Sequence, residues 1–201
     1  MENPAYSTVG ALFAKLANLP GVTDLAVYEN DQPDDDPVTG IEANTVWAIV
    51  ENGTVDNIVE TLVKQRTSGV RTKGEVEGTF TETLIRPNGA EFFMVHVMRF
   101  DRPTYVDLQV RLTVTRKDTD QPVDLDLIKQ QIAARELVIG ESLQAGELYE
   151  NAYGAGDGYI VTDMEISDDA GDTWTDGKLE PGLDEKYQID TADIDITEVI
   201  P

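Results

Sequence analysis

The sequence contains no cysteine and only one histidine, His96, among its 201 residues. The lack of cysteine excludes disulfide bonds, thiolate nucleophiles and cysteine-based metal sites. A single histidine is too few for a histidine-rich metal centre. We interpret His96, which lies in an alternating apolar segment, as a partly buried strand residue, because a histidine base usually needs a third group to orient it and the sequence indicates none. We therefore expect no cofactor and no metal.

Long hydrophobic runs are also missing. No segment is long enough to span a bilayer, and residues 1–7, Met-Glu-Asn-Pro-Ala-Tyr-Ser, do not place an apolar region after a basic one as a secretory signal does. Hydrophobic residues nevertheless make up 40% of the chain, which is ordinary for a globular protein. The sequence therefore predicts a buried core and no membrane partner.

Basic residues are scarce, above all in the last third of the chain. The formal net charge is −24, and residues 136–201 carry −16 of it, with 18 acidic side chains against two lysines. Residues 101–135 balance at zero. So acidic a surface repels nucleic acid, so no nucleic-acid partner is expected. The simplest explanation of this negative charge is that it keeps the protein soluble. The more specific hypothesis is that it forms a docking face for a basic partner. The candidate docking residues are Asp168, Asp169, Asp172 and Asp176.

Residues 101–115 organise the chain. Apolar and polar residues alternate there, which predicts a strand with one buried face. The apolar positions are Val106, Leu108, Val110, Leu112 and Val114. Helix and strand signals precede this segment and restart after it. We therefore predict an α+β protein of two related small modules, residues 1–101 and 102–201, each a mostly antiparallel sheet covered on one face by two helices.

Local signals place elements in both modules. In the first, we expect a helix capped by Ser7 or Thr8, strands at 22–29 and 45–50, a helix capped by Thr54 and closed at Ser68-Gly69, and a hairpin of 79–85 with 91–100. In the second, we expect a helix opened by Pro122, a weaker helix from Ser142 to Tyr153, a strand at 159–167, a turn at 168–176 and a last strand between 186 and 199.

Two short acidic segments could carry chemistry. Asp34–Asp36 offers oxygen ligands of the kind that calcium prefers, but the spacing of a known calcium loop is absent and flanking prolines favour an exposed loop. Residues 167–174, Ser-Asp-Asp-Ala-Gly-Asp-Thr-Trp, resemble the Asp-box of sialidases and other propellers. Even there, the resemblance implies a stabilised hairpin turn more than a catalytic residue. It leaves a carbohydrate-binding or glycan-cleaving module as the alternative function.

Several phrases, taken in order, resemble one family. Residues 100–110, Phe-Asp-Arg-Pro-Thr-Tyr-Val-Asp-Leu-Gln-Val, resemble the phrase with which the baseplate J-like family enters its last domain. These are baseplate wedge proteins of contractile phage tails and related injection machines. The other similar phrases are Leu19–Asn30, Gly40-Ile41, Thr45–Val50, Asp56–Glu60, Ser68–Val70, Ile139–Leu143, Tyr187–Ile189 and Ile196–Val199.

The resemblance implies a structural subunit of a tail baseplate and not an enzyme, because the family contributes no catalytic residues. It implies other tail or baseplate proteins as partners in a hetero-oligomer, within a virion baseplate assembled in the host cytoplasm. The family usually has a further domain on the N-terminal side, so we expect this chain to be a fragment or a short form. An acidic inhibitor that mimics nucleic acid is a third, less favoured possibility.

Overall fold

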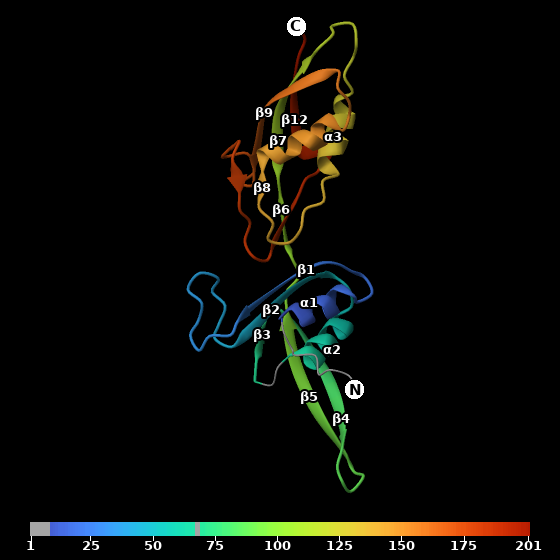
Figure 1. Cartoon of the computed structure of the whole chain (residues 1–201), viewed down its shortest axis with the longest axis vertical. Coiled ribbons are helices and arrows are strands. Elements are labelled where there is room, and N and C mark those ends of the chain that lie inside the picture. Colours follow the sequence, from blue (N-terminus) through green and yellow to red (C-terminus); the bar gives the residue numbers. More distant parts are fainter. Residues whose placement is uncertain (1–8, 67–68) are drawn as a thin grey trace. The chain divides into compact units, whose positions relative to one another are not determined.

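The computed structural model describes residues 9–66 and 69–201 (Figure 1). The chain divides into two compact units, Met1–Pro103 and Thr104–Pro201, here called unit 1 and unit 2. The division thus lies two residues beyond the one placed at 101/102 from the sequence. The predicted α+β class is confirmed. The caps expected at Ser7 or Thr8 lie outside the described residues. The second helix of unit 1, which we expected to close at Ser68-Gly69, ends earlier, at Gln65, with Arg66 as its C-cap.

Unit 1 combines two helices with a three-stranded sheet and a hairpin. Its helices are α1 (Val9–Ala17) and α2 (Val55–Gln65). The sheet has the order β1-β2-β3, in which β1 and β2 are antiparallel and β3 is parallel to β2. The strands are β1 (Val22–Asn30), β2 (Thr45–Asn52), β3 (Arg71–Lys73), β4 (Val76–Ile85) and β5 (Glu91–Phe100). The last two strands form the antiparallel hairpin predicted from the sequence.

Helix α2 begins as its sequence predicts. The Thr54 hydroxyl accepts a hydrogen bond from the Asn57 amide at 3.4 Å, which satisfies one free donor of the first turn. The apolar stripe of α2 is buried at Ile58 and Leu62. This stripe shares the core of unit 1 with strand residues from β2 and with the end of β5. The core of unit 1 therefore lies between its helices and its strands.

Unit 2 is built around strand β7 (Gln109–Arg116), which pairs parallel with β12 (Ile194–Val199) and antiparallel with β9 (Tyr159–Ser167). Two further small sheets pair β6 with β11 and β8 with β10. These strands are β6 (Thr104–Asp107), β8 (Leu143–Gln144), β10 (Lys178–Leu179) and β11 (Glu185–Gln188), and the helices are α3 (Leu125–Ala133) and α4 (Leu148–Tyr153).

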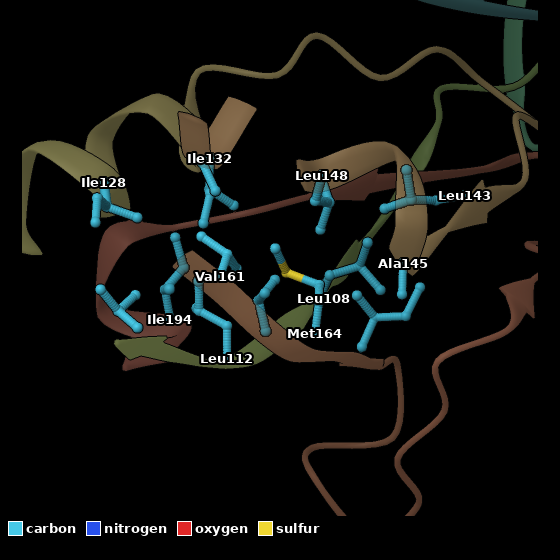
Figure 2. Close-up of a cluster of buried hydrophobic side chains, with 14 of the residues drawn as sticks. Leu108, Leu112, Ile128, Ile132, Leu143, Ala145, Leu148, Val161, Met164 and Ile194 are labelled. Atoms are coloured by element: carbon cyan, nitrogen blue, oxygen red, sulfur yellow. The ribbon is translucent and has the colours of Figure 1, made fainter. Parts of the chain in front are cut away.

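The buried face of β7 is the one predicted from alternation. Leu108, Val110, Leu112 and Val114 are all buried, and Figure 2 shows Leu108 and Leu112 within the cluster of helix and strand side chains. The predicted single strand is, however, interrupted at Leu108, whose amide donates to the Gln188 carbonyl at 2.8 Å. The chain therefore changes strand partner at this point, from β11 to β12.

Two helix starts in unit 2 differ from the prediction. Helix α3 begins at Leu125 and is capped by Asp124, whose side chain accepts from the Leu127 amide at 2.9 Å, so Pro122 lies outside the helix. The helix expected from Ser142 begins only at Leu148. The residues between form β8, which pairs with β10, and a 3₁₀ helix at Ala145–Glu147. Pairing with a distant strand therefore outweighs the local helical pattern.

Candidate partner-docking sites

The four candidate aspartates lie in one turn of unit 2, directly after β9. Asp169 holds this turn from within. Its Oδ1 atom accepts hydrogen bonds from the Ser167 hydroxyl at 2.7 Å and from the Thr173 amide at 2.8 Å. The Thr173 amide first, and then the Ser167 hydroxyl, lower the pKa of Asp169 from 3.8 to about 2, because both stabilise the carboxylate. The role of Asp169 is therefore to shape the turn.

Asp168 is also bonded inside unit 2. Its Oδ2 atom accepts from the Tyr187 hydroxyl at 2.9 Å. Burial of the ring, followed by this carboxylate, raises the pKa of Tyr187 above its ordinary value. By contrast, the carboxylates of Asp172 and Asp176 are exposed and form no hydrogen bond or ion pair within the described residues. Of the four predicted docking residues, these two present their charge outward.

The turn fits the structural interpretation of its Asp-box resemblance. Ala170 and Gly171 both have positive φ angles, 59° and 86°. A Cβ atom on Gly171 would come within 2.6 Å of the Gln109 side chain, so the backbone passes close to β7. The Trp174 ring lies under the Arg111 guanidinium, with 4.3 Å between the guanidinium carbon and the ring centroid. These contacts hold the turn against strand β7.

Two other predicted candidates have local roles. The His96 Nε2 atom lies 3.1 Å from Glu82 Oε2 across the β4–β5 hairpin, a partner that the sequence did not indicate. In the loop of Asp34–Asp36, Asp36 accepts from the Thr39 hydroxyl at 2.6 Å and from the Val38 amide at 2.9 Å. These bonds, led by the one from Thr39, lower the pKa of Asp36. No group of three or more potential metal ligands occurs among residues 9–66 and 69–201.

Unit 1 also contains a basic cleft of about 630 Å³, an unusual feature in so acidic a protein. Its basic side chains are Arg66, Arg71, Lys73 and Arg99, and Val97 of β5 lies at the same cleft. Several of them already have a partner: Arg71 lies 3.6 Å from Glu42, and Lys73 lies 3.7 Å from the centroid of the Trp47 ring. The cleft therefore carries positive charge that is only partly neutralised.

Sequence reasoning missed an exposed apolar arm, the distal part of the β4–β5 hairpin (residues 82–97). Figure 1 shows this hairpin extending beyond the helices of unit 1. Its large apolar side chains are between 39% and 65% exposed. They are Leu84, Ile85, Phe92, Phe93, Met94, Val95 and Val97. The run Phe92–Val95 was the available signal, because a strand that is apolar on both faces needs cover on both sides.

No protein-family model matches this chain, and no curated protein matches it closely enough to count as a relative. No helix in the described part of the chain is long and apolar enough to cross a membrane.

Proposed function

We propose that this chain is a structural subunit of a phage-type tail baseplate, of the wedge class that the baseplate J-like phrases suggest. It acts through protein–protein contacts with other tail subunits. The observation that carries the proposal is that segments which resemble the family, although far apart in the sequence, are hydrogen-bonded to each other in the structure.

Two such contacts support it, and a third joins one family-like segment to a residue two positions before another. The Trp47 indole donates to Asp101 Oδ2 at 2.6 Å, which joins the phrase of β2 to the phrase at residues 100–110. The Asn30 side chain donates to the Ile41 carbonyl at 2.8 Å, which joins the end of β1 to the Gly40-Ile41 phrase. In unit 2, the Gly140 amide donates to the Glu185 carbonyl at 2.8 Å, next to the closing strand phrases.

Arg102 adds a further link between β2 and residues 100–110, beside the bond from Trp47 to Asp101. Its guanidinium donates to the Val50 carbonyl at 2.8 Å and to the Gly53 carbonyl at 2.9 Å, and also contacts the Asn52 carbonyl. Burial lowers the pKa of Arg102. Arginine suits this place because its planar fork of donors can reach several carbonyls at once. The Asp-Arg pair at 101–102 thus fastens the end of unit 1 to β2.

In this role the acidic turn of unit 2 would be a contact surface. Asp168 and Asp169 hold its shape, while Asp172 and Asp176 point their charge at solvent. A pre-shaped loop loses little conformational entropy when it binds. Charge of one sign mainly accelerates encounter with an oppositely charged partner and excludes like-charged ones. The partner of this surface would therefore be a basic patch on another tail subunit.

The test is incorporation into tail particles. A tagged chain would be produced together with the tail genes of its own cluster, and intact particles would be purified by density and sedimentation. We expect the chain in the particles at a fixed ratio to the other tail proteins. Intact particles that lack the chain would contradict the proposal. The glycan alternative has its own readout, since specific binding on a glycan array would favour it.

A further inference from the structure

The apolar arm has an unpaired edge as well as exposed faces. The Arg86 amide donates to the Ala90 carbonyl at 2.9 Å at the tip of the hairpin. Along an antiparallel pair of strands, the backbone N–H and C=O groups of successive residues point alternately toward the partner strand and away from it. In this hairpin the even-numbered residues bond across to the other strand, and the odd-numbered residues direct their N–H and C=O groups outward. The Arg99 amide confirms this direction, because it donates outward to the Thr72 hydroxyl at 2.9 Å.

Farther out on β5, the outward backbone groups belong to Glu91, Phe93 and Val95. None of them has a backbone or side-chain partner among the described residues. A free strand edge with apolar side chains is a template for pairing with another strand, and stable monomers usually protect such edges with charge, proline or a bulge. Between Phe92 and Val95 none of these protections is present.

We propose that two copies of this chain pair antiparallel along their β5 edges, about a twofold axis at Met94, and so form a continuous four-stranded sheet. In this register Phe93 of each copy stands opposite Val95 of the other, and Met94 stands opposite Met94. The inference is independent of the baseplate assignment. It uses only residues of unit 1.

Charge favours this register. The hairpin, residues 76–100, holds three acidic and two basic side chains, so it is nearly neutral in a chain of net charge −24. In the proposed register, Glu91 of one copy stands opposite Val97 of the other. Val97 lies at the basic cleft together with Arg71 and Lys73. Each copy would therefore place a carboxylate at the mouth of the other copy's basic cleft, and no like charges would face each other.

Strand β5 also carries a sizeable apolar surface. Five of the large apolar side chains of the arm lie on β5 and are each roughly half exposed: Phe92, Phe93, Met94, Val95 and Val97. At ~150–250 Å² for a large side chain, they leave on the order of 400 Å² of apolar surface on the strand that would pair. This lies within the ~300–600 Å² of the largest apolar patch on a typical monomer, and such a patch is often functional.

Cysteine cross-linking tests the register. The chain has no cysteine of its own, so Met94→Cys would introduce the only thiol. Facing residues of a non-hydrogen-bonded pair have Cα atoms about 4.5 Å apart, within the ~4.4–6.8 Å that a disulfide spans. Phe92→Cys is the matched control, with 40% exposure against 39% for Met94. Its copy would lie four positions away along the strands, at roughly 13 Å.

We expect mild oxidation to convert Met94→Cys to a covalent dimer on a non-reducing gel, and to leave Phe92→Cys mostly monomeric. Both variants would be checked by circular dichroism for the parent's secondary structure. Equal cross-linking of the two would reflect random collision and would overturn the proposed register. Failure of Met94→Cys to cross-link would overturn it as well.

Proline substitutions test the edge. Val95→Pro removes an outward N–H and leaves the bonds between β4 and β5 intact, because proline is tolerated where the N–H faces solvent. Thr81→Pro makes the same change on the opposite strand, since Thr81 pairs with Val95. Sedimentation velocity up to about 100 μM should show that the parent dimerises, that Val95→Pro weakens the dimer at least about tenfold, and that Thr81→Pro leaves it unchanged.

If the parent stays monomeric over this range, a second copy does not pair with the β5 edge, and the proposal is refuted even if the chain is found in tail particles. The strand that pairs with this edge would then have to come from another subunit. An equal loss of dimer in Thr81→Pro would place the contact away from β5. Either result leaves the baseplate proposal to its own test.

Discussion

The Ser167 hydroxyl donates a hydrogen bond to Oδ1 of Asp169 over 2.7 Å, and the Gly171 amide donates back to the Ser167 oxygen over 3.0 Å. Ser167 is fully buried although it lies at the start of an acidic surface turn. The pair links the buried end of β9 to the exposed carboxylates that follow it. The acidic turn, residues 168–176, is therefore held by hydrogen bonds to the buried end of β9. Because one of these bonds is to a carboxylate, the stability that they contribute should depend on pH.

The first prediction concerns this pH dependence. Because the folded state holds the pKa of Asp169 at about 2, below its ordinary 3.8, the folded state binds this proton more weakly than the unfolded state does. The stability that results is fully present above about pH 4 and is lost as the pH falls toward 2. Asp169→Asn should flatten the fall of the melting temperature in this window. Asp172→Asn, which removes a carboxylate without hydrogen bonds, should keep the parent's slope.

The second prediction separates charge from shape in the acidic turn. The double variant Asp172→Asn/Asp176→Asn removes two outward charges and keeps the bonds of Asp168 and Asp169. We expect slower association with a basic tail subunit, and a smaller fall in association rate as salt rises, because the Debye length is only about 8 Å at physiological salt. Stopped-flow measurements over a salt series would show this. Identical salt slopes for variant and parent would leave the acidic surface without a docking role.

Much of each core could be read from periodicity. The alternation around Val110 and the helical stripe at Ile58 and Leu62 identified residues that are buried at 0–1% exposure. These patterns are reliable because a whole face must be apolar for the element to pack. The signals that failed were weaker and local. Ser142 marked a helix start, but β8 forms there because Leu143 pairs with Leu179.

The candidate site was only half predictable for a similar reason. The sequence identified the acidic turn and its four aspartates as a group. It could not assign their roles, because the partner of Asp168 is Tyr187, 19 positions away. The apolar arm was visible as the run Phe92–Val95. That nothing in the described chain covers it depends on where the helices lie, which no local pattern determines.

The third prediction concerns independent units. The core of unit 1 and the core of unit 2 share no residue, and the two tryptophans, Trp47 and Trp174, lie in different units. In a Trp174→Phe background, the fluorescence of Trp47 therefore reports on unit 1 alone. Leu62→Ala should lower the free energy of unfolding seen by Trp47 by about 2–5 kcal/mol, because it opens a cavity under α2.

Two comparisons complete this experiment. In a Trp47→Phe background, Trp174 should report the same unfolding of unit 2 with and without Leu62→Ala. Leu84→Ala, at a side chain that is 39% exposed, should cost only about 1 kcal/mol or less. A Leu62→Ala effect of equal size at both tryptophans would mean that the two units unfold as one.

The fourth prediction concerns Gly74, which lies between β3 and β4 at the base of the hairpin. Its φ angle is 148°, which side chains rarely adopt, and a Cβ atom there would come within 2.2 Å of the Phe100 carbonyl carbon. Because the obstacle is backbone, no rotamer change can relieve it. Gly74→Ala should therefore destabilise unit 1 by more than about 3 kcal/mol, measured by denaturant unfolding followed at Trp47. Gly146→Ala in unit 2, followed at Trp174, is the control, since a Cβ atom there meets nothing within 4 Å. It should stay within about 1 kcal/mol of the parent. Parent-like stability of Gly74→Ala would mean that β3 and the end of β5 do not approach each other as described, and the anchoring of the apolar arm to unit 1 would have to be revised.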